Sequence, residues 1–297
     1  MAHRLALALC AATFVLILVG GLVTNTGAAL AVPDWPTTFG YNMFLFPWSK
    51  MVGGILYEHS HRLLGAAVGM LTVALGVTLW LSERRRWLRW LGVAALLAVA
   101  LQGALGGLRV LLVANGIAIV HGSLAQAFFG LAVCLALFTS PGWAAAPVPS
   151  TDAAPLRRLA LLTTGVAYVQ IVFGAFLTHF GARLDGHLAG AAALAVLIPL
   201  LFVRVLRAAG DSPELVRPAR ALLGLLFLQL LLGVGAYAGR FTDLVLPAYF
   251  GPAFPVIHRL AGGLLLAASL VLTLRCHRLL SPPARVAGRL FSREAAA

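Results

Sequence analysis

Long apolar stretches with almost no charge are the feature that most constrains this sequence. Eight of them are present, each close to the length of about 20 residues that a helix needs to cross a bilayer. A chain of 297 residues that is 61% hydrophobic and only 10% charged cannot bury that much apolar surface in one water-soluble core. The sequence therefore predicts an all-α integral membrane protein. The predicted spans are 5–23, 61–81, 91–110, 117–139, 158–177, 187–206, 219–238 and 257–275.

The basic residues are divided unevenly between the loops. The net charge is +13, but the arginines lie mostly in alternate loops instead of on one soluble domain, which argues against a nucleic-acid partner. Because loops rich in Lys and Arg stay in the cytoplasm, we expect both termini inside and the loops around 24–57, 110–116, 178–186 and 239–256 outside. The arginines of the predicted cytoplasmic side are Arg84, Arg85, Arg86, Arg89, Arg157, Arg158, Arg204, Arg207, Arg217, Arg220, Arg275, Arg278, Arg285, Arg289 and Arg293.

The first span and the cysteines bear on the cellular compartment. A secretory signal peptide is the alternative for 5–23, but no clean small-residue cleavage site directly follows it. The chain also lacks an Arg- and Ser-rich leader, so we expect a multi-pass protein of a bacterial plasma membrane. Cys10, Cys134 and Cys276 lie in spans or at cytoplasmic ends, so no outer-face disulfide and no zinc or iron–sulfur site is expected.

A segment rich in Pro, Ala and Ser divides the spans into two groups of four. We expect an N-terminal half at 1–140, a cytoplasmic linker at 141–157, and a C-terminal half with a cytoplasmic tail at 158–297. The halves repeat weakly, which predicts two pseudo-symmetric four-helix bundles. The segments that resemble each other are VGGLVTNTGA (19–28) with FGAFLTHFGA (173–182), and LQGALGG (101–107) with LQLLLGVG (228–235).

Four histidines occupy the outer ends of the even-numbered spans. They are His61, His121, His187 and His258. All four share one depth in the membrane, and the two in each half come from helices that run in the same direction, so the spacing predicts two equivalent histidine pairs. Paired imidazoles inside a helical bundle are typical ligands of heme iron. Copper binding, or hydrogen bonds from the imidazoles to backbone carbonyls, are the alternatives.

Glycines and arginines near these histidines fit a flat, anionic ligand. A glycine four residues after a histidine clears the helix face on the ligand side. Arginines on the outer side contradict the charge rule for the rest of the chain and are expected to pair with anions such as heme propionates, or with lipid phosphates. The residues are Gly65 and Gly262, together with Arg62, Arg109, Arg183, Arg240 and Arg259.

The stretch YEHSHRLLG (57–65) adds a carboxylate to the first half. Glu58 precedes His61 by three residues and so shares its helix face, whereas Asp185 is offset from the matching histidine by only two. We therefore expect chemistry in the first half, with Glu58 as proton acceptor or electrostatic stabiliser. The alternative is an ion pair with Arg62 on the helix surface.

The first outer loop and His59 complete the predicted outer face. By the helical repeat, His59 is expected to face away from both Glu58 and His61. Asp34, Trp35 and the aromatic stretch YNMFLFPW (41–48) are expected to lie along the membrane surface as a lid over the first site, or to act only as an interfacial anchor.

These outer-face motifs resemble the heme A synthases of cytochrome oxidase assembly. The resemblance covers nearly the whole chain. It rests on TNTGAALAVPDWPTTFGYN (24–42), EHSHRLLG (58–65), VHGSLAQ (120–126) and IHRLAGG (257–263). It implies an enzyme that oxidises the C8 methyl group of heme O to the formyl group of heme A through successive hydroxylations.

The resemblance also implies roles for single residues and partners. His187 and His258 match the ligands of a bound heme b that handles electrons, His61 and His121 match the residues that face the substrate heme, and Glu58 matches the catalytic glutamate. The implied partners are a heme O synthase and other cytochrome oxidase assembly proteins, and self-association into a homo-oligomer stays open. Many family members have a cysteine pair in the first outer loop, whereas this chain has Val32 just before PDWP, which suggests a cysteine-free branch.

Two other functions fit the same pattern. A diheme b-type cytochrome that passes electrons from quinol would bind heme b in both sites and would not need Glu58. A non-catalytic assembly factor would bind heme and hand it on. A secondary transporter fits less well, because the polar residues gather at the outer face and not at the membrane midplane.

Overall fold

The computed structural model describes residues 1–242, Pro247 and residues 250–281, so the predicted tail with Arg285, Arg289 and Arg293 and part of the last outer loop lie outside the described residues. Within these ranges, eight helices are long and apolar enough to cross a membrane, which confirms the predicted all-α, eight-span class. The helices are α1 (Ala2–Asn25), α2 (Gly54–Ser82), α3 (Arg86–Leu112), α4 (Asn115–Thr139), α5 (Ala153–Phe180), α6 (Leu184–Ala209), α7 (Pro213–Phe241) and α8 (Phe250–Leu279).

Every predicted span lies inside one of these helices, and every helix is longer than the span. Hydropathy marks only the part of a helix in contact with hydrocarbon, about 20 residues, whereas helices of 24 to 30 residues continue into the headgroup region. The helix α5 shows the effect, because it begins at Ala153, inside the range predicted as linker. Arg157 is therefore a helical residue, and its guanidinium donates to backbone carbonyls at the end of α8.

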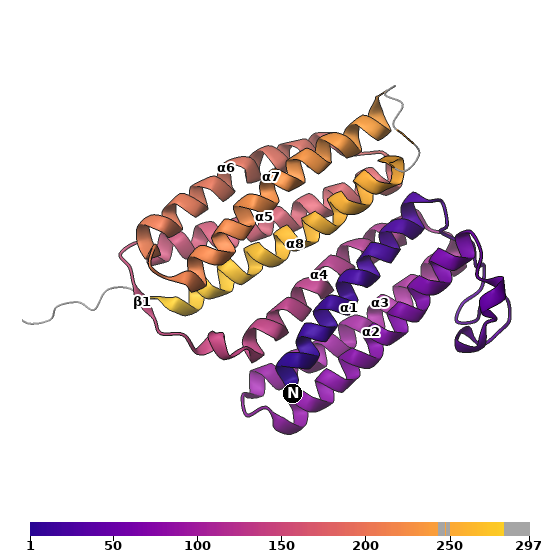
Figure 1. Cartoon of the computed structure of the whole chain (residues 1–297), viewed down its shortest axis with the longest axis horizontal. Helices are drawn as coiled ribbons and strands as arrows, with labels where there is room; N and C mark the ends of the chain where they lie inside the picture. Colours follow the sequence, from indigo (N-terminus) through magenta and orange to yellow (C-terminus); the bar gives the residue numbers. More distant parts are fainter. Residues whose placement is uncertain (243–246, 248–249, 282–297) are drawn as a thin grey trace, which may run out of the picture.

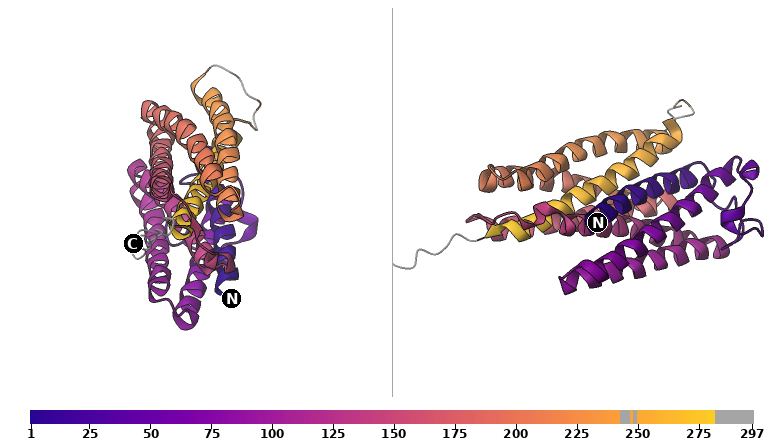
Figure 2. Two further views of the ribbon diagram at one scale, coloured as in Figure 1. Left: turned by 90° about the vertical axis from the view of Figure 1, so that its left-hand side faces the viewer. Right: turned by 60° about the horizontal axis from the view of Figure 1, so that its bottom comes forward.

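The eight helices form two rings of four (Figure 1). In the first ring α1 to α4 pack in chain order and α4 closes against α1, and α5 to α8 repeat this arrangement. The rings lie side by side in all views (Figure 2) and touch through α4 with α5, α1 with α8, and α4 with α8. Exchanging the two halves maps the contact of α4 with α5 onto that of α8 with α1. The arrangement thus has the symmetry of a two-fold axis between α4 and α8.

Leucine side chains fill the inner part of each ring, at the end where the chain begins. They are fully buried and come from all four helices of a ring, as expected for helix packing with a continuous apolar seam. The histidines lie at the other, outer end. The packed inner part fixes how each helix is rotated, and so determines what faces the ring centre further out. Representative buried leucines are Leu9, Leu75, Leu88 and Leu135 in the first ring, and Leu156, Leu201, Leu215 and Leu272 in the second.

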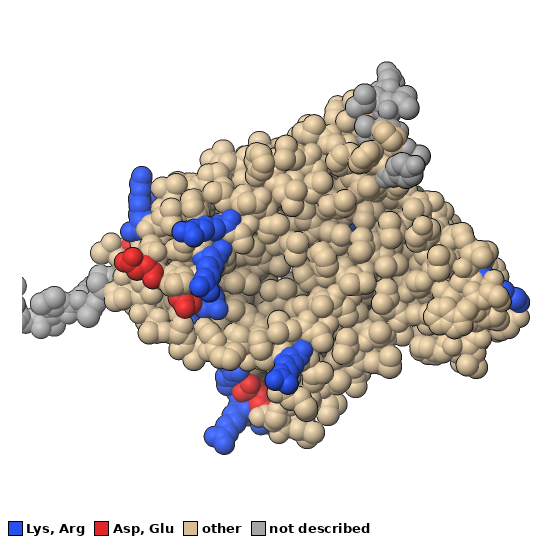
Figure 3. All heavy atoms as spheres, in the orientation of Figure 1, with Lys and Arg blue, Asp and Glu red and all other residues tan. Residues whose placement is uncertain are grey.

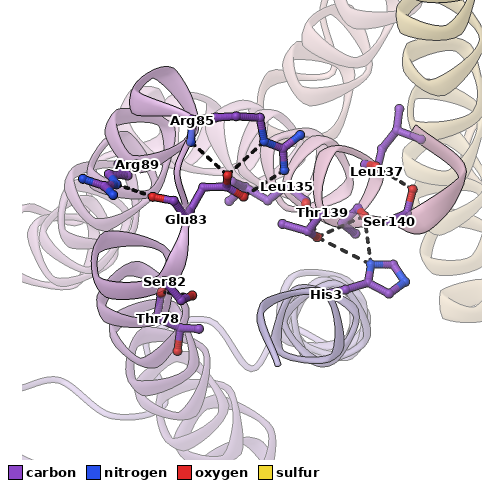
Figure 4. Close-up of polar contacts among 11 residues, drawn as sticks. His3, Thr78, Ser82, Glu83, Arg85, Arg89, Leu135, Leu137, Thr139 and Ser140 are labelled. Atoms are coloured by element: carbon purple, nitrogen blue, oxygen red, sulfur yellow. Dashed lines mark hydrogen bonds and ion pairs between the residues drawn. The ribbon is translucent and has the colours of Figure 1, made fainter. Parts of the chain in front are cut away.

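The inner end is held together by polar contacts. His3 on α1 donates through Nδ1 to the carbonyl oxygen of Ala136 on α4, at 3.0 Å, and Arg85 pairs with Glu83 at 2.8 Å between α2 and α3 (Figure 4). Hydrogen bonding from Arg85 is the main cause that lowers the pKa of Glu83 to about 2. Lys and Arg side chains gather at this end (Figure 3).

The linker contains the short helix η3 (Pro141–Ala144) and the strand β1 (Val148–Pro149). This strand pairs in parallel with β2 (Leu280–Ser281), which follows α8.

The loop between α1 and α2 lies at the outer end of the first ring (Figure 1). It contains two short helices, η1 (Met43–Leu45) and η2 (Trp48–Lys50). Asp34 organises its central turn by accepting hydrogen bonds from the backbone N–H groups of Phe39 and Gly40, at 2.8 and 2.9 Å, and from the Thr37 hydroxyl. Phe39 and Gly40 both have positive φ, at 51° and 77°, and these bonds stabilise that turn.

Candidate functional site

The structure brings the four outer histidines together as two facing pairs. His61 on α2 and His121 on α4 are diagonal neighbours across the first ring, with ring centres 6.5 Å apart and planes at 81°. His187 on α6 and His258 on α8 repeat this in the second ring, at 6.1 Å and 69°. The pairs are the ones that the sequence spacing predicts.

The spacing of the rings fits two imidazoles that bind one metal atom between them. A metal–imidazole bond is about 2 Å long, and the ring centre lies roughly 1 Å beyond the nitrogen, so two ligands of one metal have ring centres about 6 Å apart. Within the described part of the chain, no group of three or more His, Cys, Asp or Glu side chains could hold a metal ion. Two histidines alone leave a bare zinc or copper ion short of ligands, whereas heme brings four nitrogens of its own and needs only axial ligands. The residues present therefore fit heme.

Each histidine ring packs against a glycine of the preceding helix. A Cβ added at these glycines would lie between 2.9 and 3.4 Å from the Cε1 atom of the facing ring, which is closer than side chains normally pack. Glycine thus lets the odd-numbered helix approach the imidazole and holds the ring from behind. We call these four residues the cradle glycines. They are Gly20 against His61, Gly106 against His121, Gly174 against His187, and Gly233 against His258.

The sequence analysis missed the cradle glycines and selected two others. Gly65, four residues after His61, has open space where a Cβ would be, as predicted. Gly262, four residues after His258, does not, because a Cβ there would lie 3.2 Å from the side-chain nitrogen of Gln229. The predicted clearance therefore holds only in the first ring. The signal for the cradle glycines was available in the segments LQGALGG and LQLLLGVG, whose resemblance places a glycine at the same point of α3 and α7.

The Nδ1 atom of each ring lies nearer than Nε2 to the cradle glycine, on the side of the preceding helix. His187 Nδ1 donates to the carbonyl oxygen of Gln170 at 3.3 Å, which leaves Nε2 as the free nitrogen. The Nδ1 atoms of His61, His121 and His258 are buried without a hydrogen-bond partner among the described residues. Because Nδ1 lies on the side of the preceding helix, a ligand between the two rings would meet Nε2 and not these atoms.

Glu58 is the one buried acidic side chain among the described residues, at 5% exposure. Its Oε2 accepts a hydrogen bond from the backbone N–H of Val32 at 3.0 Å, and its Oε1 accepts one from Arg62 at 2.8 Å. A carboxylate has about four acceptor positions, so these two bonds leave capacity for a further proton or hydrogen bond. Asp185, the acid nearest the histidine of α6, is exposed. The two rings thus differ in this carboxylate.

Arg62 connects Glu58 to the outer loop. Besides Glu58, its guanidinium donates to the carbonyl oxygens of Val32, Asp34 and Thr37, at 3.0, 2.7 and 2.9 Å. Both terminal nitrogens of Arg62 thus bind the loop and the carboxylate. The sequence predicted heme propionates or lipid phosphates as its partners, with an ion pair to Glu58 on the helix surface as the alternative; this ion pair is present, but it is buried. Contact with the substrate stays a prediction.

His59 also faces the outer loop. As predicted, it does not belong to either histidine pair, but it is buried (1% exposed) and shares a hydrogen bond of 3.1 Å with the Thr38 hydroxyl. Its ring packs on Phe46 with centres 5.0 Å apart. Trp35 lies against Gly107 on α3, directly after the cradle glycine of His121, so closely that a Cβ there would overlap the indole. The loop is thus attached to both α2 and α3 beside the first pair.

Arginines of the two rings approach each other at the outer end. Arg109 on α3 and Arg259 on α8 are close enough to repel each other, and Glu58 attracts Arg109. Within the described residues neither arginine has a hydrogen-bond or ion-pair partner. Arg240 donates to the carbonyl oxygen of Thr178 at 3.0 Å, and Arg183 is exposed. Arg109 and Arg259 are therefore the outer arginines best placed to meet an anion between the rings.

Comparison with known proteins agrees with these features. Residues 42–186 match the family described as cytochrome oxidase assembly protein. A heme A synthase of Shouchella clausii (strain KSM-K16) is 29% identical over 172 residues, which cover 56% of this chain and 55% of that protein. The match to the cytochrome oxidase assembly family covers just under half of the chain, so over this part the chain is similar to that family. This confirms the resemblance to the heme A synthases that the sequence motifs indicated.

The matched range includes the candidate residues of the first ring but not the histidines of the second ring. The match to the cytochrome oxidase assembly family includes Glu58, His61, Arg62 and His121 and ends one residue before His187. The chain spans about half the length of the curated relative that it matches. The free cysteines Cys10, Cys134 and Cys276 all lie in helices, and Val32 is fully buried in the outer loop.

Proposed function

We propose that the protein is a heme A synthase, which oxidises the C8 methyl group of heme O to a formyl group. The observation that carries the proposal is the combination of two matched histidine pairs with one buried carboxylate, Glu58, beside the first pair only. Two equivalent heme sites, of which only one has an acid–base group, suit an enzyme with one resident heme and one heme that is changed. The match of residues 42–186 to the cytochrome oxidase assembly family supports this.

The two pairs then have different occupants. His187 and His258 hold a resident heme b, and His61 and His121 hold the substrate heme O. Heme b, when bound, supplies one-electron transfer. The cradle glycines fix the imidazoles from behind, and Arg109 and Arg259 are placed to neutralise propionate groups at the outer end.

Glu58 acts on the substrate in the first ring. Oxidation of a methyl carbon releases protons, and a fixed carboxylate stabilises the positive charge that develops and accepts a proton at one of its oxygens. Two hydroxylations convert the methyl group through an alcohol to a geminal diol, which loses water to give the aldehyde; each takes its oxygen atom from water, releases two protons and passes two electrons to an acceptor outside the chain. The bonds from Val32 and Arg62 hold Glu58 in place, and the outer loop with Trp35 covers this end of the ring and restricts water.

The surroundings follow from the same proposal. We place the protein in a bacterial plasma membrane with both termini in the cytoplasm, because the basic side chains gather at the inner end (Figure 3). Heme O is then supplied by a heme O synthase, and heme A passes to cytochrome oxidase during its assembly.

The variant Glu58→Gln tests the proposal. We expect it to bind heme b as the parent does and to accumulate heme O in place of heme A, because the amide keeps the shape but cannot accept a proton. The measurement is extraction of the hemes from the purified protein and their separation by chromatography. Asp185→Asn, which removes a carboxylate at the outer end of the second ring, is the matched control and should make heme A normally. Unchanged heme A in Glu58→Gln would contradict the proposal.

A diheme b-type cytochrome is the second candidate, favoured by the nearly equal geometry of the two pairs. It predicts heme B in both sites and no effect of Glu58→Gln on the bound hemes. The same extraction separates the candidates, since heme O or heme A in the parent protein contradicts the cytochrome. A non-catalytic assembly factor would contain transferred heme but would make no heme A from added heme O.

A further inference from the structure

A cavity between α3 and α4 lies directly inward of the first histidine pair. Its volume is about 130 Å³. Apart from one glutamine amide, its walls are aliphatic or aromatic. The lining residues are Ala98, Leu101 and Gln102 of α3 and, on α4, four side chains from Leu124 to Leu131.

The cavity continues the histidine site toward the inner end of the ring. On α3 it begins at Gln102, one turn before the cradle glycine Gly106, and on α4 at Leu124, close to one turn after His121. Gln102 also joins the two helices here, because its Nε2 donates to the carbonyl oxygen of His121 at 3.3 Å. Leu131 follows Leu124 by seven residues, so the cavity extends along α4 for about 10 Å.

The cavity leads from the interior of the ring to its lipid-facing surface. Phe128, on its inner wall, is 5% exposed and belongs to the apolar core of the first ring, whereas Leu101 is 52% exposed. An apolar cavity of about 150 Å³ stays dry and can bind benzene. An isoprene unit is slightly smaller than benzene. The cavity is therefore large enough for one such unit, and a longer chain can leave it past Leu101 into lipid.

The second ring does not repeat this lining. Where α3 and α4 have Ala98 and Ala127, α7 and α8 have leucines, and where α4 has Leu124 and Leu131, α8 has alanines. The small residues that leave room beside His121 are thus not at the matching positions beside His258. The replacing residues are Leu225, Leu264, Ala261 and Ala268.

Gln102 adds one polar atom to the cavity. Its Oε1 is buried and has no hydrogen-bond partner among the described residues. Such an acceptor suits a ligand with a hydroxyl group at this point. The Oε1 atoms of Gln170 and Gln229 in the second ring are also unpartnered, so the apolar cavity, and not the acceptor, distinguishes the first ring.

We propose that the α3–α4 cavity binds the start of the hydroxyethylfarnesyl chain of heme O, with the hydroxyl group of the chain on Gln102 Oε1. The inference rests on the proposed function, in which the first pair holds heme O. Heme O differs from heme B by this chain, which leaves the porphyrin at the edge opposite to the propionates. Because Arg109 and Arg259 place the propionates at the outer end, the chain points inward, where the cavity lies. The first ring is thereby selective for a farnesylated heme.

Heme binding by the full-length chain in detergent tests the inference. His187→Ala and His258→Ala together remove the second site, and His258→Ala alone serves if the double variant does not fold. Absorbance titrations with heme O and with hemin, which lacks the chain, give the two Kd values. In this background heme O should bind more tightly than hemin, and equal Kd values would overturn the inference.

Filling the cavity should weaken the binding of heme O only. Ala127→Leu should raise the Kd of heme O about tenfold, as overpacking by a few methylene groups does, and leave that of hemin within about twofold. Ala98→Leu fills the cavity from the other helix and carries the test if Ala127→Leu does not fold. Ala100→Leu is the matched control, because Ala100 is an exposed residue of α3 outside the lining, and it should change neither Kd.

Gln102→Leu tests the hydroxyl contact. It should weaken heme O more than hemin, since hemin has no hydroxyl group at this position. Equal weakening of both hemes by Gln102→Leu would overturn this contact. The cavity itself is overturned as the site of the chain if the alanine variants leave the Kd of heme O within about twofold, which would assign the cavity to a lipid acyl chain, or if they weaken hemin equally.

The titrations also separate this inference from the proposed function. If neither heme O nor hemin binds to the chain without the second site, the first pair is no heme site and the proposed function fails. If both hemes bind but neither responds to the cavity variants, only the assignment of the cavity is overturned.

Discussion

At the scale of the residue, each histidine is positioned by what lies behind it. The cradle glycines bring the preceding helix within contact distance of the Cε1 atoms of the rings. An imidazole in a membrane needs such support, since it is costly there unless it is held and bound. A side chain at Gly20, Gly174 or Gly233 would therefore require the facing ring to shift.

Replacement of a cradle glycine by alanine should disturb one pair selectively. In Gly174→Ala the new Cβ lies 3.2 Å from Cε1 of His187, so the ring must shift away from its partner. Overpacking of this kind costs about 1–3 kcal/mol, against the roughly 0.5–1 kcal/mol that alanine gains over glycine in a helix. We expect a lower thermal midpoint in detergent and loss of bound heme B. Gly165→Ala on the same helix has open space at its Cβ and should keep both; if it loses heme equally, the steric explanation fails.

The sequence predicted the histidines better than their supports. Four imidazoles in apolar helices are conspicuous, and their spacing alone pairs them correctly. Glycine is common in this chain, and which glycine faces a ring depends on the rotation of two helices, which only the packed leucines of the inner end determine. For the same reason Gly262 was taken to be free space, although Gln229 fills it.

At the scale of the element, the first outer loop is attached to the ring by polar side chains. Arg62 donates to three loop carbonyls, Glu58 accepts from Val32, and His59 meets Thr38. These contacts give the loop a fixed position without a disulfide.

The sequence predicted the positions of the membrane spans correctly because hydropathy is a local property. It did not reveal these contacts, because they join residues more than 20 positions apart.

The turn at Asp34 should make the loop sensitive to acid. Partial burial raises the pKa of Asp34, but the hydrogen bonds from Gly40, Thr37 and Phe39 outweigh it and lower the pKa from 3.8 to about 2. The carboxylate therefore stabilises the loop fully above pH 3.8, and this contribution is lost as the pH falls through about 2. Fluorescence of Trp35, which follows Asp34 and packs on Gly107, should change over this range.

Asp34→Asn provides the decisive comparison. The amide cannot be protonated in this range, so the variant should show the loosened fluorescence at neutral pH and no transition between pH 3.8 and 2. Asp185→Asn, an exposed acid at the outer end of the other ring, should keep the transition of the parent. A transition of the same size in Asp34→Asn would show that another group controls the loop.

At the scale of the whole molecule, the repeat builds two similar sites and a few residues make them different. The halves share their ring order, their histidine diagonals and their cradle glycines. Glu58 and the attached loop belong to the first half only. On the proposed function, this repeat lets one ring bind a resident heme and the other bind the heme that is oxidised, and both histidine pairs lie at the same end of the bundle.

The side of the membrane that carries these sites follows from charge. Lys and Arg gather at the inner end (Figure 3), so that end should be cytoplasmic and Glu58 should lie toward the outer surface. We expect a membrane-impermeant maleimide to label Lys50→Cys in intact cells, and to label Arg84→Cys only after the cells are permeabilised. Both positions are exposed, and the native Cys10, Cys134 and Cys276 lie within helices, so the parent protein gives the background. The reverse labelling pattern would place the histidine pairs on the cytoplasmic side and would require heme O to enter from there.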